Sequence, residues 1–290
     1  MVSPLRDLMA PPPGMAAIDF TSPQGAAALV SPHSVSWRVF KNPVSLFIGG
    51  AAAVILELAE PRVRTGVWEH TSFRADPVGR MRRTGYAAMA TIYAPTEAAE
   101  AMIAAVNAGH ARIRGQTPAG ESFSAADTDL LVWVHATAAF GFLSAYRRFV
   151  RRLSQEERDR FYAEGMRAAA LYGAIGAPRS EGACAELFTR TIPTLEKSEI
   201  VFEFLDILAK APIAPTPLAG MQKLLVKAAV ALVPVRIREI LELGRDWDLP
   251  LGAETVIHAA GAAADRFVLK DAPPAQACVR MGLKADYLYR

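Results

Sequence analysis

Three of the chain's five histidines lie between residues 69 and 135, and two of them fall among apolar residues at helical spacing. His110 follows Ile103 and Val106 at steps of three and four, and His135 belongs to a similar apolar stripe. A buried imidazole needs a hydrogen-bond partner or a metal for its ring nitrogens. We therefore expect both histidines to point inward, where they either pack or hold a cofactor.

Three cofactor chemistries can be considered for an inward His110. A single imidazole suits a haem iron. A zinc site would need a Cys or carboxylate at helical spacing, whereas the residue four further on is Arg114, which instead suits a haem propionate. A non-haem iron site built from His70, His110 and Glu69 is a third option, although no spacing rule supports it. The residues alone thus predict a buried cofactor or ligand in a helical bundle and favour haem.

Composition and charge exclude several functional classes. A net charge of +3 over 290 residues gives no basis for nucleic-acid binding. Cys184 and Cys278 form no CxxC pair, which predicts a reducing, cytoplasmic environment. The opening residues lack the apolar core of a secretory signal, and the strongest apolar run, residues 44–58, is too short for a membrane span. The sequence contains no P-loop, nucleophile elbow or zincin motif.

Hydrophobic periodicity, caps and breakers predict an all-α, single-domain bundle of about eight to ten helices. One helix begins at Thr96 and carries His110. The others are expected over residues 43–59, 80–93, 127–152, 154–172, 183–190, 194–210, 216–233, 234–244 and 253–270, and a further short helix over 61–68 is left open. We expect a flexible or extended arm at residues 1–33, a short extended entry at 34–42, the domain over 34–270 and a coil-like tail at 271–290, with a short helix in the tail left open. No pattern of alternating strands is evident.

The helix over residues 43–59 is expected to be fully buried because it is apolar nearly all round. Its middle consists of Gly49, Gly50 and three alanines, which leave almost no side-chain bulk. Two arrangements require such a surface: a close crossing with another helix, or a flat ligand against the backbone. The sequence leaves both open.

Several segments together resemble the MpaB-type oxygenase family, which includes the bacterial latex-clearing (rubber) oxygenases. They are FIGGAAAVILELAEP, GVWEHTSFRADPVGRMRRT, NAGHARIRG, DLLVWVHAT, SAYRRFVRRLSQEERDRFYAE and ALVPVRIRE, within residues 37–250. The resemblance implies an all-α fold around a haem b pocket. It implies that His110 is the proximal iron ligand and that Arg80 and Thr84, the family's Arg-x-x-x-Thr motif, lie close to the haem.

The resemblance also raises questions about individual positions. Arg83 stands where latex-clearing relatives can place a lysine on the distal side of the iron, and a guanidinium is a poor ligand. His70 is then the nearest candidate for the distal side, and His135 matches a family position with a structural or supporting role. Glu60 replaces a histidine that is common in the family. The catalytic glutamate of the rubber-cleaving members cannot be assigned to Glu60 or Glu69 by spacing.

The expected function is that of a haem b-dependent oxygenase that uses O2 to attack a small lipophilic, isoprenoid-like substrate. Arg80 or Arg114 would pair with a propionate, and Thr84 would donate a hydrogen bond near the haem. Two alternatives stay open: a non-catalytic haem protein (sensor, carrier or peroxide-handling protein), and a helical lipid-binding module without haem. Homo-oligomerisation is also left open.

Overall fold

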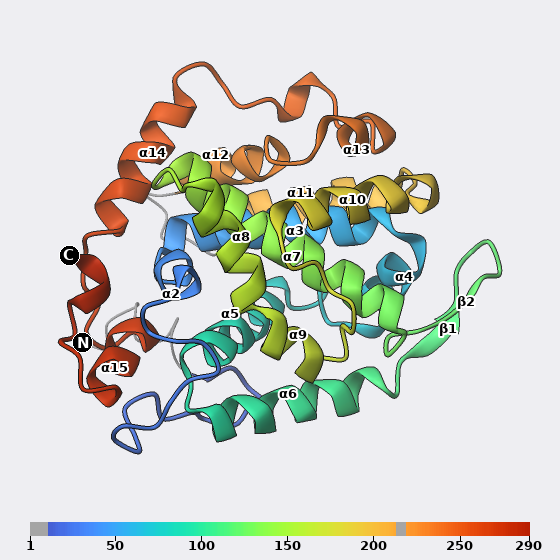
Figure 1. Cartoon of the computed structure of the whole chain (residues 1–290). Coiled ribbons are helices and arrows are strands. Elements are labelled where there is room, and N and C mark those ends of the chain that lie inside the picture. The colour runs from blue at the N-terminus through green and yellow to red at the C-terminus, as the bar shows by residue number, and fades with distance from the viewer. Residues whose placement is uncertain (1–10, 213–218) are drawn as a thin grey trace.

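In the computed structural model, which describes residues 11–212 and 219–290, two long helices run side by side through the centre of the protein. These are α3 (Pro43–Ala59) and α7 (Thr128–Phe149) (Figure 1). Their backbones nearly touch where Gly49 faces Gly141 and Phe142: a Cβ atom on Gly49 would lie only 2.7 Å from Phe142 Cα. The small residues of α3 therefore serve a close helix crossing, one of the two arrangements considered from the sequence.

The start and end of α3 follow from local chemistry. Asn42 caps the helix, since its side-chain oxygen accepts hydrogen bonds from the backbone N–H groups of Val44 and Ser45, each at 3.1 Å. Pro43 occupies the first helical position, where its missing N–H has no cost, and Glu60 ends the helix just before Pro61. The predicted bounds of this helix are confirmed, whereas its burial is less than complete, since Val44, Leu46 and Phe47 are only half-buried.

The other helices surround this pair, and the all-α, single-domain prediction is confirmed. They are α2 (Val35–Phe40), α4 (Pro61–His70), α5 (Pro77–Tyr93), α6 (Thr96–His110), α8 (Gln155–Glu164), α9 (Met166–Leu171), α10 (Glu181–Thr191), α11 (Glu199–Lys210), α12 (Ala219–Val230), α13 (Val235–Ile240), α14 (Ala253–Ala264) and α15 (Pro273–Arg280). Helices α11, α12 and α14 contact α3, whereas α8 and α10 contact α7. In Figure 1, α12, α13 and α14 lie above the central pair, and α5 and α6 lie below it.

The helices outnumber the eight to ten expected, for identifiable reasons. Residues 35–40 form helix α2 rather than an extended entry, because Ser34 caps them by accepting from the N–H of Trp37 at 3.0 Å. The single helix expected over 154–172 is broken at Gly165 into α8 and α9. The predicted helix over 216–233 is observed from residue 219, and its first three residues lie outside the described residues.

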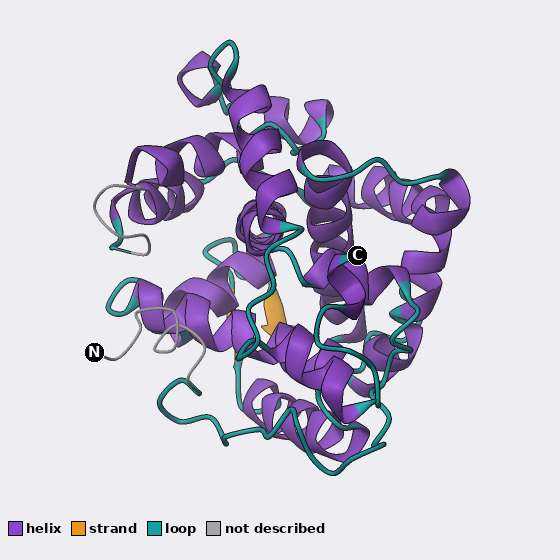
Figure 2. Cartoon of the chain, turned by 90° about the vertical axis from the view of Figure 1, so that its left-hand side faces the viewer, coloured by secondary structure: helices purple, strands orange, loops and turns teal. Residues whose placement is uncertain are grey.

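A small antiparallel hairpin interrupts the helices between α6 and α7. Strand β1 (Arg114–Gln116) pairs with β2 (Ser122–Ser124), with Gly115 opposite Phe123, as the orange arrows of Figure 2 show. The sequence analysis missed these strands. Helix α6 ends at His110, so Arg114 is not one helical turn beyond that histidine, as the spacing argument had assumed.

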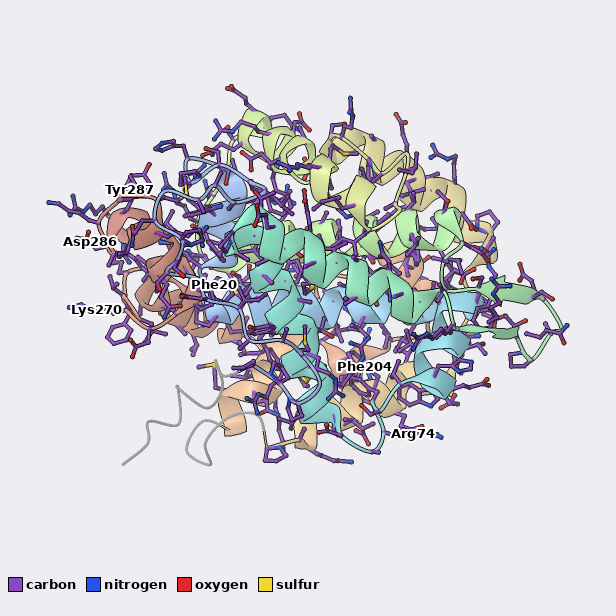
Figure 3. All side chains as sticks on the ribbon, turned by 90° about the horizontal axis from the view of Figure 1, so that it is seen from below. Phe20, Arg74, Phe204, Lys270, Asp286 and Tyr287 are labelled. Atoms are coloured by element: carbon purple, nitrogen blue, oxygen red, sulfur yellow. The ribbon has the colours of Figure 1, made fainter. Side chains whose placement is uncertain are left out.

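The two ends of the domain are joined by a buried arginine. Residues 11–33 contain no helix but contribute Phe20, Leu29 and Val30 to the core, while residues 1–10 of the expected arm lie outside the described residues. Fully buried Arg280, in α15, donates to the carbonyl oxygens of Phe20 and Ala26 at 2.9 Å and of Tyr93 at 2.7 Å. Figure 3 shows Asp286 and Tyr287 of the C-terminal segment at the end of the molecule opposite the hairpin.

One helix within residues 11–212 and 219–290, α7, is long and apolar enough to cross a membrane on the criteria of length and composition. Half of its apolar window is buried inside the protein. Helices α3 and α4 meet the same criteria only when joined, and they are bent by 111° at Glu60. Their packing is that of core helices, and this agrees with the expectation drawn from residues 44–58.

Because α3 and α7 leave no room for a side chain between Gly49 and Gly141, we expect Gly141→Ala to lower the free energy of unfolding by about 2 kcal/mol. Denaturant unfolding followed by circular dichroism measures this. Gly182→Ala on the exposed surface of α10 is the matched control, with an expected change below about 0.5 kcal/mol. Equal stability of the two variants would contradict the close crossing.

Candidate functional site

Helix α5 presents Arg80 and Thr84 together. Asp76 caps the helix by accepting from the N–H of Gly79 at 2.8 Å, and Pro77 occupies the first turn. Arg80 and Thr84 therefore lie one turn apart on the same face. The Arg80 Nη1 group donates to Thr84 Oγ1 at 2.7 Å, which fixes the guanidinium along the helix. The two residues of the Arg-x-x-x-Thr motif thus form one unit.

A carboxylate from α3 lies in the electrostatic range of Arg80. Burial raises the pKa of Glu57 to about 7, although the positive charge of Arg80 and a hydrogen bond with the Thr137 hydroxyl of α7 both act to lower it. Burial in turn lowers the pKa of Arg80, against the opposing effect of Glu57. Residues from α3, α5 and α7 therefore influence one another's charge in a poorly solvated region, although Glu57 and Arg80 are not within ion-pair distance. At neutral pH, Glu57 compensates the charge of Arg80 only in part.

The positive charge of Arg80 also acts on the imidazole of His110. This histidine is the last residue of α6, and burial, followed by the charge of Arg80, lowers its pKa below the ordinary value of 6.5. The imidazole is accordingly neutral at pH 7. Its Nδ1 atom is buried and has no hydrogen-bond partner within the described chain. A neutral imidazole with an unpaired nitrogen is the form that binds a metal ion.

His135 lies on a different face of α7 from Thr137, as expected for residues two apart on a helix. It packs at the junction of α8 and α9, where a methyl group added to Gly165 would lie 3.6 Å from His135 Nε2. Burial lowers the pKa of His135 to about 4. Its surroundings favour a packing role, the alternative that the sequence left open for this residue.

Three predicted site residues remain, which are His70, Arg114 and Arg83. His70 is exposed at the end of α4, with its ring near strand β1, and Arg114 is exposed in that strand. Arg83 is turned toward the loop between α4 and α5, where it donates to Ser72 Oγ at 2.5 Å and lies 3.6 Å from Asp76. Only Arg83 of these three contributes to the potential at Arg80. The functional roles assigned to them from the sequence stay predictions.

Glu60 has a structural position. Its buried side chain caps α4 by accepting from the N–H of Val63 at 2.8 Å, and it pairs with Arg62 at 2.7 Å. The carboxylate here thus fixes the sharp turn from α3 into α4.

Metal sites built from three side chains find no support. Within the described residues, no three His, Cys, Asp or Glu side chains gather closely enough to bind a metal ion. The non-haem iron alternative from His70, His110 and Glu69 is therefore wrong. A cofactor that takes a single protein ligand is unaffected by this result.

Glu57 is the residue that the sequence analysis missed. It is the one charged residue within the apolar run of residues 44–58. A lone carboxylate on a helix that is apolar nearly all round must be buried, and a buried carboxylate has a functional or pairing reason. That signal was present in the sequence.

Comparison with known proteins adds a decisive observation. Residues 37–264 match the family model described as "ER-bound oxygenase mpaB/B'/Rubber oxygenase, catalytic domain". The chain belongs to this family. No curated protein and no solved structure matched the chain. The matched region contains Glu57, Arg80, Thr84 and His110, so the site lies within an oxygenase catalytic domain.

Glu57→Gln tests the buried carboxylate. Because the pKa of Glu57 is raised from 4.5 to about 7, ionisation destabilises the fold as pH rises through that interval. We expect the variant to be more stable than the wild type at pH 8, by up to about 3 kcal/mol, and equal to it near pH 4.5. Thermal unfolding measured as a function of pH tests this. Exposed Glu186→Gln is the control, and its stability relative to the wild type should not change with pH.

His135→Gln gives the opposite pH dependence. The wild-type fold keeps His135 neutral, so it loses stability as pH falls from 6.5 toward 4, where the unfolded chain takes up a proton and the fold does not. We expect the variant to lose less stability than the wild type between pH 7 and pH 5, by about 2 kcal/mol. Exposed His258→Gln should follow the wild type. An unchanged acid profile in His135→Gln would show that this ring is solvated.

Proposed function

We propose that this protein is a haem b-dependent oxygenase that uses O2 to attack a small lipophilic substrate, with His110 as the ligand of the haem iron. The observation that carries the proposal is the buried, unpaired nitrogen of a neutral imidazole beside Arg80, inside an oxygenase catalytic domain. The His110 side chain is half-buried, so one part of the ring is enclosed while another stays accessible.

The residues present fit the chemical demands of a haem. The group needs an imidazole for iron, apolar walls for the porphyrin and cations for its two carboxylates. Arg80 is a half-buried cation that Glu57 neutralises incompletely near pH 7, so an added carboxylate would stabilise it. Half-buried apolar side chains lie on the same helices, with Val54 one turn before Glu57 and Met81 next to Arg80.

When bound, haem supplies the one-electron and O2 chemistry that amino-acid side chains lack. The protein's own residues would bind this group and orient it. His110 would hold the iron as a neutral ligand, and Thr84 would hold the Arg80 guanidinium in position toward a carboxylate. Glu57, whose pKa lies near neutrality, is suited to take up or release a proton close to this cation.

The proposed substrate class follows from the surroundings of the site. The helices that carry Glu57 and His110 are rich in Ala, Val and Ile, and such walls exclude water and favour an apolar molecule. A cytoplasmic location is retained as part of the proposal, and the two cysteines, both buried and unpaired, are compatible with a reducing compartment.

His110→Ala should abolish haem binding. We expect purified wild type to carry about one haem b per chain after reconstitution, measured by the Soret band and the pyridine haemochrome, and His110→Ala to carry almost none. His258→Ala, which removes an exposed imidazole, should keep the full complement. A wild-type protein that stays colourless in the presence of hemin would refute the proposal. Full haem in His110→Ala combined with loss in His135→Ala would transfer the ligand role to His135.

Oxygen consumption separates an oxygenase from a non-catalytic haem protein. The haem-loaded protein should consume O2 when supplied with an unsaturated lipophilic compound and a reductant, measured with an oxygen electrode. Arg80→Leu should reduce this rate about a hundredfold, in the range expected when a positioning charge is lost. Consumption that is independent of the added compound would argue for a sensor or carrier.

A further inference from the structure

A cavity of about 500 Å³ has none of Glu57, Arg80 and His110 among its lining residues. It is formed by residues from α2, the end of α7, the end of α14 and the C-terminal segment. Five of its lining side chains are Lys or Arg, whereas Asp265 is the one carboxylate among the described residues that line it. The proposed oxygenase activity assigns no role to this concentration of positive charge.

The single carboxylate is already fully engaged. Asp265 lies 3.2 Å from Lys41 Nζ and accepts a hydrogen bond from the side chain of Asn42 at 3.2 Å. It also accepts from the Tyr146 hydroxyl at 3.4 Å. Lys41 is buried and donates to the carbonyl oxygens of Asp265 and Leu288, each at 2.7 Å. Lys41 and Asp265 therefore compensate each other and form the buried side of the cavity.

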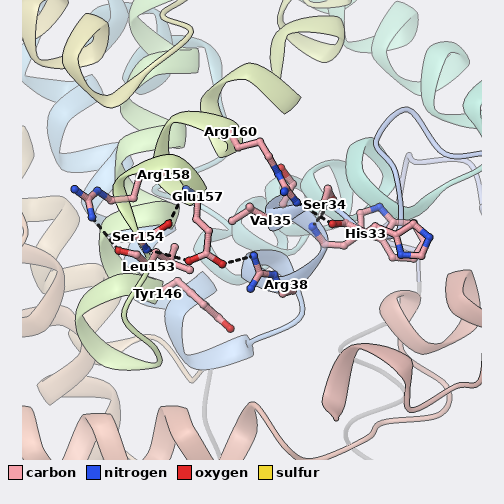
Figure 4. Close-up of polar contacts among 12 residues, drawn as sticks. His33, Ser34, Val35, Arg38, Tyr146, Leu153, Ser154, Glu157, Arg158 and Arg160 are labelled. Atoms are coloured by element: carbon pink, nitrogen blue, oxygen red, sulfur yellow. Dashed lines mark hydrogen bonds and ion pairs between the residues drawn. The ribbon is translucent and has the colours of Figure 1, made fainter.

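Arg151 and Arg266 have no such compensation. In the part of the chain that the structure describes, Arg151 has no ion pair and no side-chain hydrogen bond, and Arg266 donates only to the carbonyl of Ala262 at 2.9 Å. Arg38 is bound to Glu157 at 2.7 Å, as Figure 4 shows. Arg290 is paired with Asp286 at 2.9 Å. Arg151 and Arg266 thus lack a carboxylate within ion-pair distance, although Glu157, the partner of Arg38, lies within the electrostatic range of Arg151.

The positive charges of Arg151 and Arg38 influence groups in the interior of the cavity. The charges of Arg151 and Arg38 lower the pKa values of both Lys41 and Tyr146, which lie on the buried side. Burial is the larger cause for each group, lowering the pKa of Lys41 and raising that of Tyr146. Arg151 and Arg38 both influence Lys41 and Tyr146, and all four residues line the same cavity.

We propose that this cavity binds the phosphate group of a small phosphorylated molecule, with Arg151 and Arg266 as its principal cationic partners and Arg38 beside them. A phosphate carries between one and two negative charges at neutral pH, which suits two guanidinium groups that have no carboxylate within ion-pair distance. Guanidinium groups bind phosphate oxygens in a bidentate manner. A volume of about 500 Å³ exceeds the needs of a bare ion and suits a small organic molecule.

Binding of inorganic pyrophosphate, measured by isothermal titration calorimetry on the full chain, tests the site. We expect saturable binding that weakens at least about tenfold in Arg151→Glu. The matched control is Arg152→Glu, because Arg152 is the next residue, is equally exposed and does not line the cavity. It changes the net charge identically and should bind pyrophosphate within about twofold of the wild type.

Several outcomes overturn the proposal. The proposal is overturned if the protein neither binds pyrophosphate at millimolar concentration nor sediments with phosphatidic acid vesicles. Equal loss in Arg151→Glu and Arg152→Glu would show that binding reflects net surface charge alone. Sedimentation with phosphatidic acid vesicles that depends on Arg151 and is absent with phosphatidylcholine would support phosphate recognition and assign it to a lipid headgroup. Because cavity and haem site share no residues, these results stand apart from the haem measurements.

Discussion

The close crossing of α3 and α7 is the constraint on which the rest of the structure depends. Only glycine lets the two backbones approach as they do at Gly49 and Gly141, and the packed pair forms the axis around which the other helices gather. The same crossing places Glu57 of α3 within hydrogen-bonding reach of Thr137 on α7. A packing requirement thus also creates the poorly solvated environment in which a carboxylate has a pKa near neutrality.

The candidate site extends this environment to two further helices. Arg80 is the common electrostatic neighbour of Glu57 and His110, so α3, α5 and α6 meet at one half-buried cation. A charge in such a place is costly unless it is compensated, and the chain compensates it only in part. Chains commonly retain incompletely balanced groups of this kind where a ligand supplies the missing charge.

Local chemistry explains which features could be predicted from sequence. The start of α3 was predictable because Asn42 and Pro43 act within a few residues, and the family segments indicated Arg80, Thr84 and His110. The hairpin was not predictable from alternation, because strands of three residues are too short to show a period of two. Helix α2 was missed because its six residues are too few to show an apolar period of 3.6, although Ser34 caps it. The electrostatic interaction of Glu57 with Arg80 depends on residues 23 positions apart and required the tertiary structure.

Arg280 has a consequence for how the chain is made. Its guanidinium joins the carbonyl groups of Phe20 and Ala26 to that of Tyr93, and both residues 11–36 and residues 265–290 lie outside the region matched to the oxygenase family. A ribosome delivers Phe20 some 260 residues before its partner. The first segment can dock earlier through Tyr86 and Thr96, which are hydrogen-bonded to Ile18 and Ala27, but the carbonyl groups of Phe20 and Ala26 meet their guanidinium partner only when Arg280 has been made. Helix α15 therefore joins the fold after the segments that its arginine connects have been made.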